Sequence, residues 1–258
     1  MKNKDRKIIG IVGGMGPFAG LDLNQKIFEY TATRVEQDHL EVYLLSSSSL
    51  IPDRTEFLLN PDRIENPGKA VYRVIEKLSR IGAEIIGIPC NTSHSPRIFN
   101  CILENIENNG LSVTLLNMIR ETHDFLRIAH PGVERVGLLA TKGTYFSGVY
   151  THVFASAGEV EVMNPSPSEQ ETVHACIYDS GFGIKNHPNP LRKEAVDGLA
   201  GVARSLIAAG AQAIVMGCTE IPLALRPVSL TVPRIDTTAI LARALIARAD
   251  PTVLRKQD

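Results

Sequence analysis

The stretch that decides the fold is LSRIGAEIIGIPC (residues 78–90), because it returns without a gap as LIAAGAQAIVMGC (residues 206–218), 128 residues later. Each copy has the pattern of a helix end, a Gly-Ala pair, a β-branched strand and a cysteine. The first strand repeats almost in step, since IGIV (9–12) matches VGLL (136–139) at an offset of 127 residues. A helix followed by Gly-Ala and a strand is common in α/β proteins, but two nearly equal offsets favour an internal duplication. The sequence therefore predicts two similar lobes in tandem.

Short runs rich in β-branched residues alternate with longer helical patterns along the whole chain. The predicted strands are 7–12, 41–45, 84–88, 112–115, 135–139, 160–163 and 213–216, and clear helical patterns cover 70–81, 117–129 and 192–209. Gly82 and Gly210 stand where C-terminal caps belong. This alternation is typical of α/β proteins with mostly parallel sheets. We therefore expect two lobes, each a mostly parallel sheet flanked by helices, related by a pseudo-twofold axis with the active site in the cleft between them.

The repeat also suggests where the lobes begin and end. We expect the first lobe to comprise residues 1–116 plus about 228–258, and the second lobe to comprise residues 117–227. The segment 234–236 and the helical pattern 239–249 have no counterpart in the repeat as read from the sequence. We therefore expect this C-terminal stretch to pack back on the first lobe.

Composition excludes several classes of protein. The 258 residues include 27 basic and 28 acidic side chains, a formal charge of −1, which lacks the cationic field that nucleic acids and anionic membranes require. No apolar run approaches the roughly 20 residues that span a bilayer. The basic start, residues 1–7, leads straight into a strand-like run rather than a signal-peptide core, so we expect a cytoplasmic protein without nucleic-acid or membrane partners.

The four cysteines are Cys90, Cys101, Cys176 and Cys218, and no two of them have the CxxC spacing of a zinc or redox site. Cys90 and Cys218 occupy equivalent places in the repeat, each just after a buried strand, where open α/β sheets place their ligands. If the turns that follow open helices, their free N–H groups would lower the thiol pKa. A single cysteine near a strand end is more often a small buried hydrophobe, and we keep that interpretation for Cys101 and Cys176.

Two opposed thiols suit the removal of a proton from one face of a carbon acid and its delivery from the other face. The product of such a step is the mirror image of the substrate. No cofactor is needed if the site stabilises the carbanion through donors to the substrate carboxylate. The pair therefore predicts a racemisation or a related isomerisation.

Other motifs give weaker signals. The turn Gly13-Gly14-Met15-Gly16 after the first strand fits neither GxGxxG nor the P-loop, so it does not indicate a nucleotide. His174 and Cys176 are too close and too isolated in sequence for a metal site, and we predict no metal. His94 and Glu220 follow the two cysteines closely, and either can tune a thiol or serve as a cap or hydrogen-bond partner.

Four motifs give the chain its resemblance to a known family: residues 13–17 (GGMGP), 52–55 (PDRT), 89–94 (PCNTSH) and 216–222 (MGCTEIP). Over almost its whole length the chain resembles the cofactor-independent Asp/Glu racemases, and more closely their aspartate racemase branch. One departure concerns substrate range, because Gly20 stands where many aspartate racemases have a threonine. The resemblance implies a racemase of aspartate, with glutamate and other amino acids left open, and a homodimer.

The resemblance also implies roles for individual residues. Cys90 and Cys218 would be the proton donor and acceptor, and no cofactor would be required. The residues that it assigns to the substrate's α-carboxylate and the floor beneath it are Asn91, Thr92, Thr219, Met15 and Gly16. Arg54 and Lys185 would contact the side-chain carboxylate of a small acidic amino acid.

Physical chemistry gives independent support for two cations, because a dianionic amino acid in a closed cleft needs positive charge away from the thiols. Arg54 lies in a Pro- and Asn-rich stretch, 46–68, and Lys185 lies in another, 164–192, and both stretches have the composition of lids. The alternative for each residue is an ordinary solvated charge.

Three other functions stay open at this point. A maleate isomerase of the same superfamily also has two cysteines, whereas a decarboxylase of that kind keeps one. A two-lobed amino-acid binding protein would carry the thiols incidentally.

Overall fold

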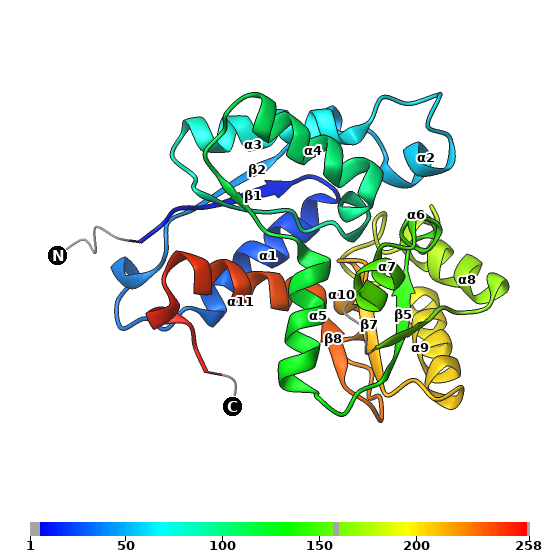
Figure 1. Ribbon diagram of the computed structural model, residues 1–258. Coiled ribbons are helices and arrows are strands. Elements are labelled where there is room, and N and C mark those ends of the chain that lie inside the picture. Colours follow the sequence, from blue (N-terminus) through cyan, green and yellow to red (C-terminus); the bar gives the residue numbers. More distant parts are fainter. Residues whose placement is uncertain (1–5, 157–159, 257–258) are drawn as a thin grey trace.

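The computed structural model describes residues 6–156 and 160–256, and its frame is two four-stranded sheets in which every strand pair is parallel (Figure 1). The first sheet has the order β2 (Val42–Ser46), β1 (Ile9–Gly13), β3 (Ile85–Gly87), β4 (Thr114–Leu115). The second has the order β6 (Glu161–Met163), β5 (Arg135–Ala140), β7 (Ala213–Gly217), β8 (Arg234–Asp236). The predicted α/β class and the two parallel sheets are confirmed.

Helices cover both faces of the first sheet (Figure 1). On one face, α2 (Arg54–Leu59), α3 (Pro67–Arg80) and α4 (Pro96–Asn108) bury apolar side chains against the strands. On the other face, α1 (Pro17–Tyr30) and α11 (Thr237–Ala249) do the same. The helix α3 is strongly amphipathic, with Val71, Ile75 and Leu78 buried, so burial of apolar area holds it to the sheet.

The second sheet is covered in the same way. One face packs against α8 (Pro167–Tyr178), α9 (Lys193–Ala208) and α10 (Ile221–Leu225), and the other against α5 (Met118–Ala129) and α7 (Val149–Ser156). The short helix α6 (Lys142–Ser147) follows β5. Four 3₁₀ turns complete the described part, and they are η1 (Glu36–Asp38), η2 (Ser48–Leu50), η3 (Asn91–His94) and η4 (Pro251–Val253).

The internal repeat is present in the packing as well as in the sequence. Gly10 on β1 pairs with Ile86, and Gly137 on β5 pairs with Ile214, which are equivalent positions. A Cβ on Gly10 would come within 2.7 Å of Ile86 Cδ1, and one on Gly137 within 2.8 Å of Ile214 Cδ1. In each lobe the central strand therefore needs glycine so that the repeated helix and strand can pack closely. The predicted caps are also confirmed, because Gly82 and Gly210 have φ of +107° and +103° directly after α3 and α9.

The two lobes exchange their last helices. The helix α5 follows β4 of the first sheet but packs against the second sheet, and α11 follows β8 of the second sheet but packs against the first. The two helices contact each other where the lobes meet (Figure 1). The repeat thus extends to the C-terminus, contrary to our expectation. The helix 239–249 packs on the first lobe as expected, but strand 234–236, which we had placed there too, pairs with β7 of the second sheet.

The two stretches that we expected to be lids contain regular structure. Residues 46–68 hold η2 and α2, and residues 164–192 hold the twelve-residue helix α8. Ser166 caps α8 by accepting a hydrogen bond from Glu169 N, and the Glu169 carboxylate accepts one from Ser166 N in return. The proline at 167 thus begins a helix rather than a loop. Only the part after α8, from residue 179 to 192, is a turn-rich connection.

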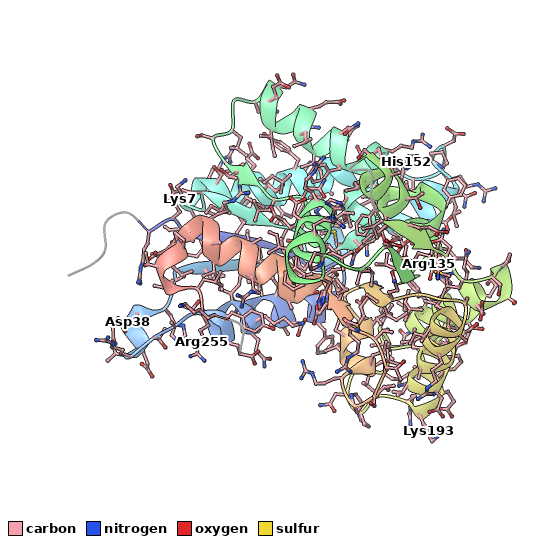
Figure 2. The ribbon with its side chains drawn as sticks, turned by 60° about the horizontal axis from the view of Figure 1, so that its bottom comes forward. Lys7, Asp38, Arg135, His152, Lys193 and Arg255 are labelled. Carbon is pink, nitrogen blue, oxygen red and sulfur yellow. The ribbon has the colours of Figure 1, made fainter. Side chains whose placement is uncertain are left out.

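The outer surface carries dispersed charge of both signs. Figure 2 shows Lys7, Asp38 and Arg255 around the first lobe and Arg135 and Lys193 on the second. Within residues 6–156 and 160–256, no helix is long and apolar enough to cross a bilayer. Residues 1–5, part of the basic start on which the predicted location rests, lie outside the described residues.

Candidate active site

A small cavity of about 240 Å³ lies between the lobes, at the carboxyl ends of the parallel strands. β3 leads into Cys90 on one side, and β7 ends directly before Cys218 on the other. The cavity is lined by Met15, Arg54, Cys90, Asn91, Thr92, Thr141, Tyr178, Lys185, Gly217, Cys218, Thr219 and Glu220. The two equivalent cysteines of the repeat therefore face one space, at the end of the sheets where open α/β folds bind ligands.

Cys218 and its neighbours form a chain of polar contacts along one wall. The Cys218 thiol donates a hydrogen bond to Glu220 Oε2 over 3.0 Å, and the Thr219 hydroxyl donates to the same oxygen over 3.2 Å. Lys185 Nζ lies 3.7 Å from the other carboxylate oxygen, Oε1. Burial favours the neutral acid, but Lys185 and the hydrogen bonds hold the pKa of Glu220 below its ordinary value. Glu220 is therefore a buried carboxylate that holds the proton on Cys218.

We expected helix N-termini to lower the pKa of both thiols, and for Cys218 this is wrong. Burial and the Glu220 carboxylate raise the pKa of Cys218 well above its ordinary value, against the opposing charge of Lys185. The helix after it, α10, has only five residues, and Glu220 is its N-cap residue. The turn thus places a carboxylate beside the thiol. Cys218 is a protonated thiol, the form that can deliver a proton.

Lys185 reaches the cavity from the turn after α8. The N–H groups of Ile184 and Lys185 donate to carbonyls of the last turns of α8, which fixes where the side chain begins. Its Nζ lies 4.7 Å from the centre of the Tyr178 ring, and its side chain is 19% exposed. Burial disfavours the charge, yet Glu220 raises the pKa of Lys185 above its ordinary value. The structure thus places a charged lysine in the cavity wall, already paired with a carboxylate.

Arg54 is the first residue of α2, a helix capped by Asp53, which accepts a hydrogen bond from Glu56 N over 2.8 Å. The Arg54 side chain is buried, and Nη1 donates to Pro52 O over 3.3 Å. Burial opposes its charge, but Cys90 and Asp53 raise the pKa of Arg54. Its Nε has no hydrogen-bond partner among the described residues. A cavity-lining guanidinium with an unused N–H suits a carboxylate ligand.

Asn91 lines the cavity but its side chain is already used. Tyr150 OH donates to Asn91 Oδ1 over 2.5 Å, and Asn91 Nδ2 donates to Thr237 Oγ1 over 3.4 Å. Tyr150 lies on α7 and Thr237 begins α11, so these bonds tie η3 of the first lobe to helices that pack elsewhere. The Asn91 side chain therefore fixes the lobes relative to each other, and a ligand there would meet the backbone of the turn.

Thr92 joins the lobes in a similar way. Its hydroxyl lies 3.2 Å from Thr141 Oγ1 and 2.9 Å from Thr144 Oγ1, and those two hydroxyls are 3.2 Å apart. All three side chains are buried. Thr92 and Thr141 also line the cavity, so this hydroxyl cluster forms part of its wall.

The turn after β1 forms the rest of the floor. Met15 lines the cavity, and its sulfur lies 3.4 Å from Ser93 Oγ. Gly16 does not line this cavity; a Cβ there would lie 3.1 Å from Glu220 Oε1, so Gly16 backs the carboxylate instead. Gly14 has φ of +101°, and a Cβ would come within 2.6 Å of Ser48 N. Only glycine fits this turn.

His94 lies behind the site. Its Nδ1 is 3.0 Å from Cys90 O, its ring stacks on Phe99, and it does not line the cavity. Burial lowers the pKa of His94 to about 4. The side chain is therefore a neutral imidazole that supports the turn after Cys90, in agreement with the capping alternative.

The other two cysteines lie away from the cavity. Cys101 is a half-buried residue of α4, with Asn105 Nδ2 3.7 Å from its sulfur. Cys176 is buried between α8 and α9, where a Cβ on Gly198 would meet its sulfur at 2.6 Å. His174 stacks on Tyr178 with ring centres 4.6 Å apart. In the part of the chain that the structure describes, no three His, Cys, Asp or Glu side chains are grouped so that they could hold a metal ion.

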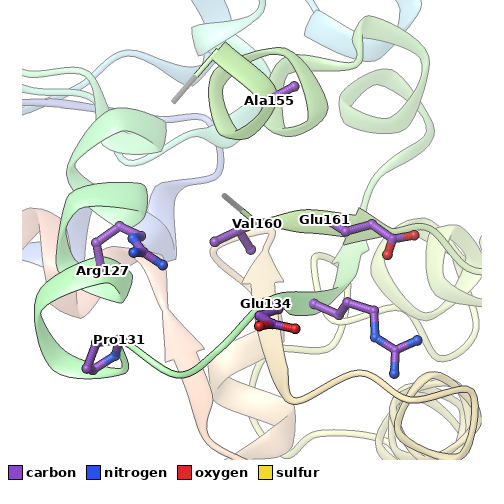
Figure 3. Close-up of a pocket in the computed structure, with 7 residues that line it drawn as sticks. Arg127, Pro131, Glu134, Ala155, Val160 and Glu161 are labelled. Atoms are coloured by element: carbon purple, nitrogen blue, oxygen red, sulfur yellow. The ribbon is translucent and has the colours of Figure 1, made fainter. Parts of the chain in front are cut away.

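A second hollow lies at the opposite end of the second sheet (Figure 3). It is lined by side chains that include Glu134, Arg135 and Glu161, and β5 and β6 begin at the last two of these. Amino ends of parallel strands are not where α/β sheets place their ligands, and the hollow contains no cysteine. We therefore do not assign the chemistry to it.

Two cavity residues were missed from the sequence. Thr141 follows β5 as Gly14 follows β1, at the repeat offset of 127 residues, so the repeat itself could have indicated it. Tyr178 ends α8, and its place in a proline-rich stretch gave no such signal. Among the predicted residues, the structure brings together Met15, Arg54, Cys90, Asn91, Thr92, Lys185, Cys218, Thr219 and Glu220.

Comparison with known proteins gives a consistent result. The model of the Asp/Glu/hydantoin racemase family matches residues 12–245. The broad-specificity amino-acid racemase RacX of Bacillus subtilis is 25% identical over 248 residues, covering 93% of this chain and 97% of that protein. The structure of Picrophilus torridus aspartate racemase has a TM-score of 0.78 and 30% identity, covering 94% of each chain. A putative Asp/Glu racemase from Yersinia pestis has a TM-score of 0.72 and 25% identity, covering 94% of this chain and 99% of that one.

These matches extend over both lobes and both cysteines, and they confirm the resemblance on which the sequence prediction rested. Racemases are isomerases, since they interconvert mirror images. The chain belongs to the Asp/Glu/hydantoin racemase family and is an isomerase of that kind.

Proposed function

We propose that the chain is a pyridoxal-phosphate-independent racemase that interconverts L- and D-aspartate, and also accepts glutamate, by proton transfer at Cα between two cysteines. The observation that carries the proposal is that Cys90 and Cys218, equivalent positions of an internal repeat, line one cavity between the lobes. Groups that approach one carbon from two similar lobes can act on its opposite faces. Two proton-transfer groups on opposite faces invert the configuration of the carbon.

The proposed step needs one thiolate and one thiol. The thiolate takes the Cα proton, so that the Cα–H bond breaks, an S–H bond forms and the electron pair stays on Cα. The second thiol then gives its proton to the opposite face and becomes the thiolate. Cys218, whose proton is held by Glu220, is the donor in one direction and the acceptor in the reverse direction. The cations of the cavity stabilise the carbanion electrostatically, and no cofactor takes part.

Two features support an acidic substrate. Arg54 and Lys185 give the cavity two positive charges against the single carboxylate of Glu220, so an anionic amino acid is attracted to it. Arg54 in addition keeps an unused Nε–H. We assign the side-chain carboxylate of aspartate to Arg54, with Lys185 contributing less because Glu220 already compensates its charge. The α-carboxylate is assigned to the turns that contain Asn91, Thr92 and Thr219, beside Met15.

The first experiment incubates the purified protein with L-aspartate in deuterated water, without added pyridoxal phosphate. We expect deuterium at Cα by NMR and D-aspartate by chiral chromatography. Aspartate binding without exchange would instead identify a binding protein, and conversion of maleate to fumarate without exchange would identify a maleate isomerase.

The same assay tests the two cysteines. Cys90→Ala and Cys218→Ala should each lower kcat in both directions by about 10²-fold or more, because each sulfur is base one way and acid the other. Cys101→Ala is the matched control, since Cys101 lies outside the cavity, and should keep nearly full turnover. Undiminished racemisation in either cavity variant would refute the two-thiol mechanism. The homodimer and the cytoplasmic location stay predictions.

A further inference from the structure

A second, apolar chamber of about 310 Å³ adjoins the catalytic cavity on its Cys218 side. The side chains that make it apolar are Pro17, Phe18, Ile184, Pro188 and Leu223. The first two begin α1 of the first lobe, Ile184 and Pro188 lie in the turn after α8, and Leu223 lies on α10. The chamber is therefore a space between the lobes, as the catalytic cavity is.

The two spaces meet at Lys185 and Glu220, which line both of them. Lys185 Nζ and Glu220 Oε1 are 3.7 Å apart, which is longer than a hydrogen bond. The pair therefore does not close the wall by a tight contact. Because each charge compensates the other, and because the lysine methylenes present an apolar surface, this junction can accept an uncharged group.

The charges at the other end of the cavity are arranged differently. Arg54 comes from α2 and has a buried, unused Nε–H, so that end demands a carboxylate. The Cys218 end offers a compensated ion pair and then an apolar space lined by both lobes. A substrate without a side-chain carboxylate gains nothing from Arg54, but it can bury a linear apolar side chain in the chamber.

We propose that the chamber is a second side-chain subsite, and that the same two cysteines also racemise neutral amino acids whose linear apolar side chains have about the length of methionine. This inference rests on the proposed racemase function and extends its substrate class. Leu223 and Phe18 set the length that the chamber accepts, because both line it and neither lines the catalytic cavity.

The first test compares Cα–H exchange in deuterated water for L-methionine, L-alanine and L-aspartate. Alanine has the same α-carbon chemistry but no group that reaches the chamber. We expect kcat/KM for methionine to exceed that for alanine by roughly tenfold or more, since each methylene in an apolar pocket contributes on this order. Methionine turnover equal to or below alanine turnover would overturn the subsite.

Two variants with a matched control test the position of the subsite. Leu223→Trp should fill the chamber and lower kcat/KM for methionine roughly tenfold or more, with aspartate changed less than about twofold. Leu21→Trp is the control, because Leu21 is 54% exposed one turn along α1 and does not line the chamber, so both substrates should be unaffected. Phe18→Ala, at a side chain that is 45% exposed, should instead improve turnover of longer side chains such as norleucine.

The outcomes separate this inference from the function on which it rests. If aspartate exchanges but methionine does not, or if Leu223→Trp lowers both substrates equally, the subsite is refuted and the racemase stands. If no amino acid exchanges, the proposed function itself fails. A thermal melt of each variant shows whether it folds, and Phe18→Ala, at a partly exposed position, tests the subsite if Leu223→Trp does not fold.

Discussion

Buried charge at the level of single residues decides what each side of the cavity can do. Glu220 is 4% exposed and stays ionised because Lys185 lies beside it, and it in turn keeps the proton on Cys218. Arg54 has no carboxylate on its Nε in the described residues, so its charge is left for a ligand. One cation is thus committed within the protein and one is available.

Arg54 gives the sharpest prediction for the acidic substrate. Arg54→Ala should lower kcat/KM for aspartate roughly 10- to 150-fold, because a charge-assisted hydrogen bond in a closed site contributes about 1.5–3 kcal/mol. An amino acid without a side-chain charge should be barely affected. Arg54→Lys should recover only part of the loss, since an ammonium lacks the guanidinium fork. Steady-state kinetics on aspartate and alanine check this, and an equal loss on both would move Arg54 to the α-carboxylate or to the fold.

His94 gives a prediction on pH. Burial lowers the pKa of His94 from 6.5 to about 4, so between these values the unfolded chain binds a proton that the folded chain does not. Its contribution to stability is therefore complete above pH 6.5 and is lost as the pH falls toward 4, by about 3 kcal/mol. His94→Gln should flatten this part of the stability curve.

Urea unfolding at pH 7 and pH 4.5 measures the effect. His152→Gln is the control, because His152 is exposed on α7 and should leave the acid dependence as it is in the parent protein. Equal acid sensitivity in the His94→Gln and parent proteins would mean that His94 is not the group responsible.

At the level of elements, the short helices α2 and α6 close one side of the site by direct contact. A Cβ on Gly143 of α6 would come within 2.7 Å of Thr55 Oγ1 and 2.8 Å of Thr55 Cα, on the helix that begins with Arg54. Because the second of these atoms is backbone, the two helices cannot both stay in place if residue 143 has a side chain. Glycine here sets the distance between the lobes over the cavity.

Gly143→Ala should therefore displace α2 and lower kcat/KM for aspartate by about tenfold to a hundredfold, since an error of about 1 Å in a catalytic group has this effect. Gly201→Ala is the matched control, because a Cβ at Gly201 of α9 meets nothing within 4 Å. The control should keep full activity and gain about 0.5–1 kcal/mol of stability from its better helix propensity. The same activity in both variants would show that the α2–α6 contact does not position Arg54.

The elements also show what a sequence can and cannot predict. The strands, and the cysteines that follow two of them, were predictable because Gly10, Ile86 and their repeat equivalents leave a local, periodic signal. The helix α8 carried a capping box at Ser166 and Glu169, but the prolines around it indicated a loop. The pairing of β8 with β7 left no signal, because a strand of three residues is placed by contacts distant in sequence.

The same limit applies to the site. The cysteines and Arg54 were predictable from motifs, whereas the pKa direction of Cys218 was not, because it depends on how Glu220 folds back on the thiol. Tyr178 and Thr144 reach the site through tertiary packing from α8 and α6. Local pattern thus predicts which groups are present, and the lobes' packing decides their electrostatics.

For the molecule as a whole, the lobes are tied together by the exchange of α5 and α11 and by one buried charge cluster. Lys26 of α1, in the first lobe, bonds to Asp22 on the same helix and lies 3.0 Å from Asp236 Oδ2. Asp236 ends β8 of the second sheet and caps α11 by accepting from Thr238 N and Ala239 N. A single lysine therefore joins both lobes at the point where the chain crosses back.

Lys26→Ala should leave two carboxylates in a largely buried place without their cation, which costs about 3 kcal/mol or more in the free energy of unfolding at pH 7. The loss should shrink as the pH falls, because protonation removes the charge that the missing lysine had compensated. Lys193→Ala is the matched control, since the Lys193 side chain is 85% exposed in its pair with Asp197 and should change stability by less than about 0.5 kcal/mol. Urea unfolding of both variants at pH 7 and pH 5 measures this. A Lys26→Ala protein as stable as the Lys193→Ala protein at pH 7 would show that the helix exchange alone holds the lobes together.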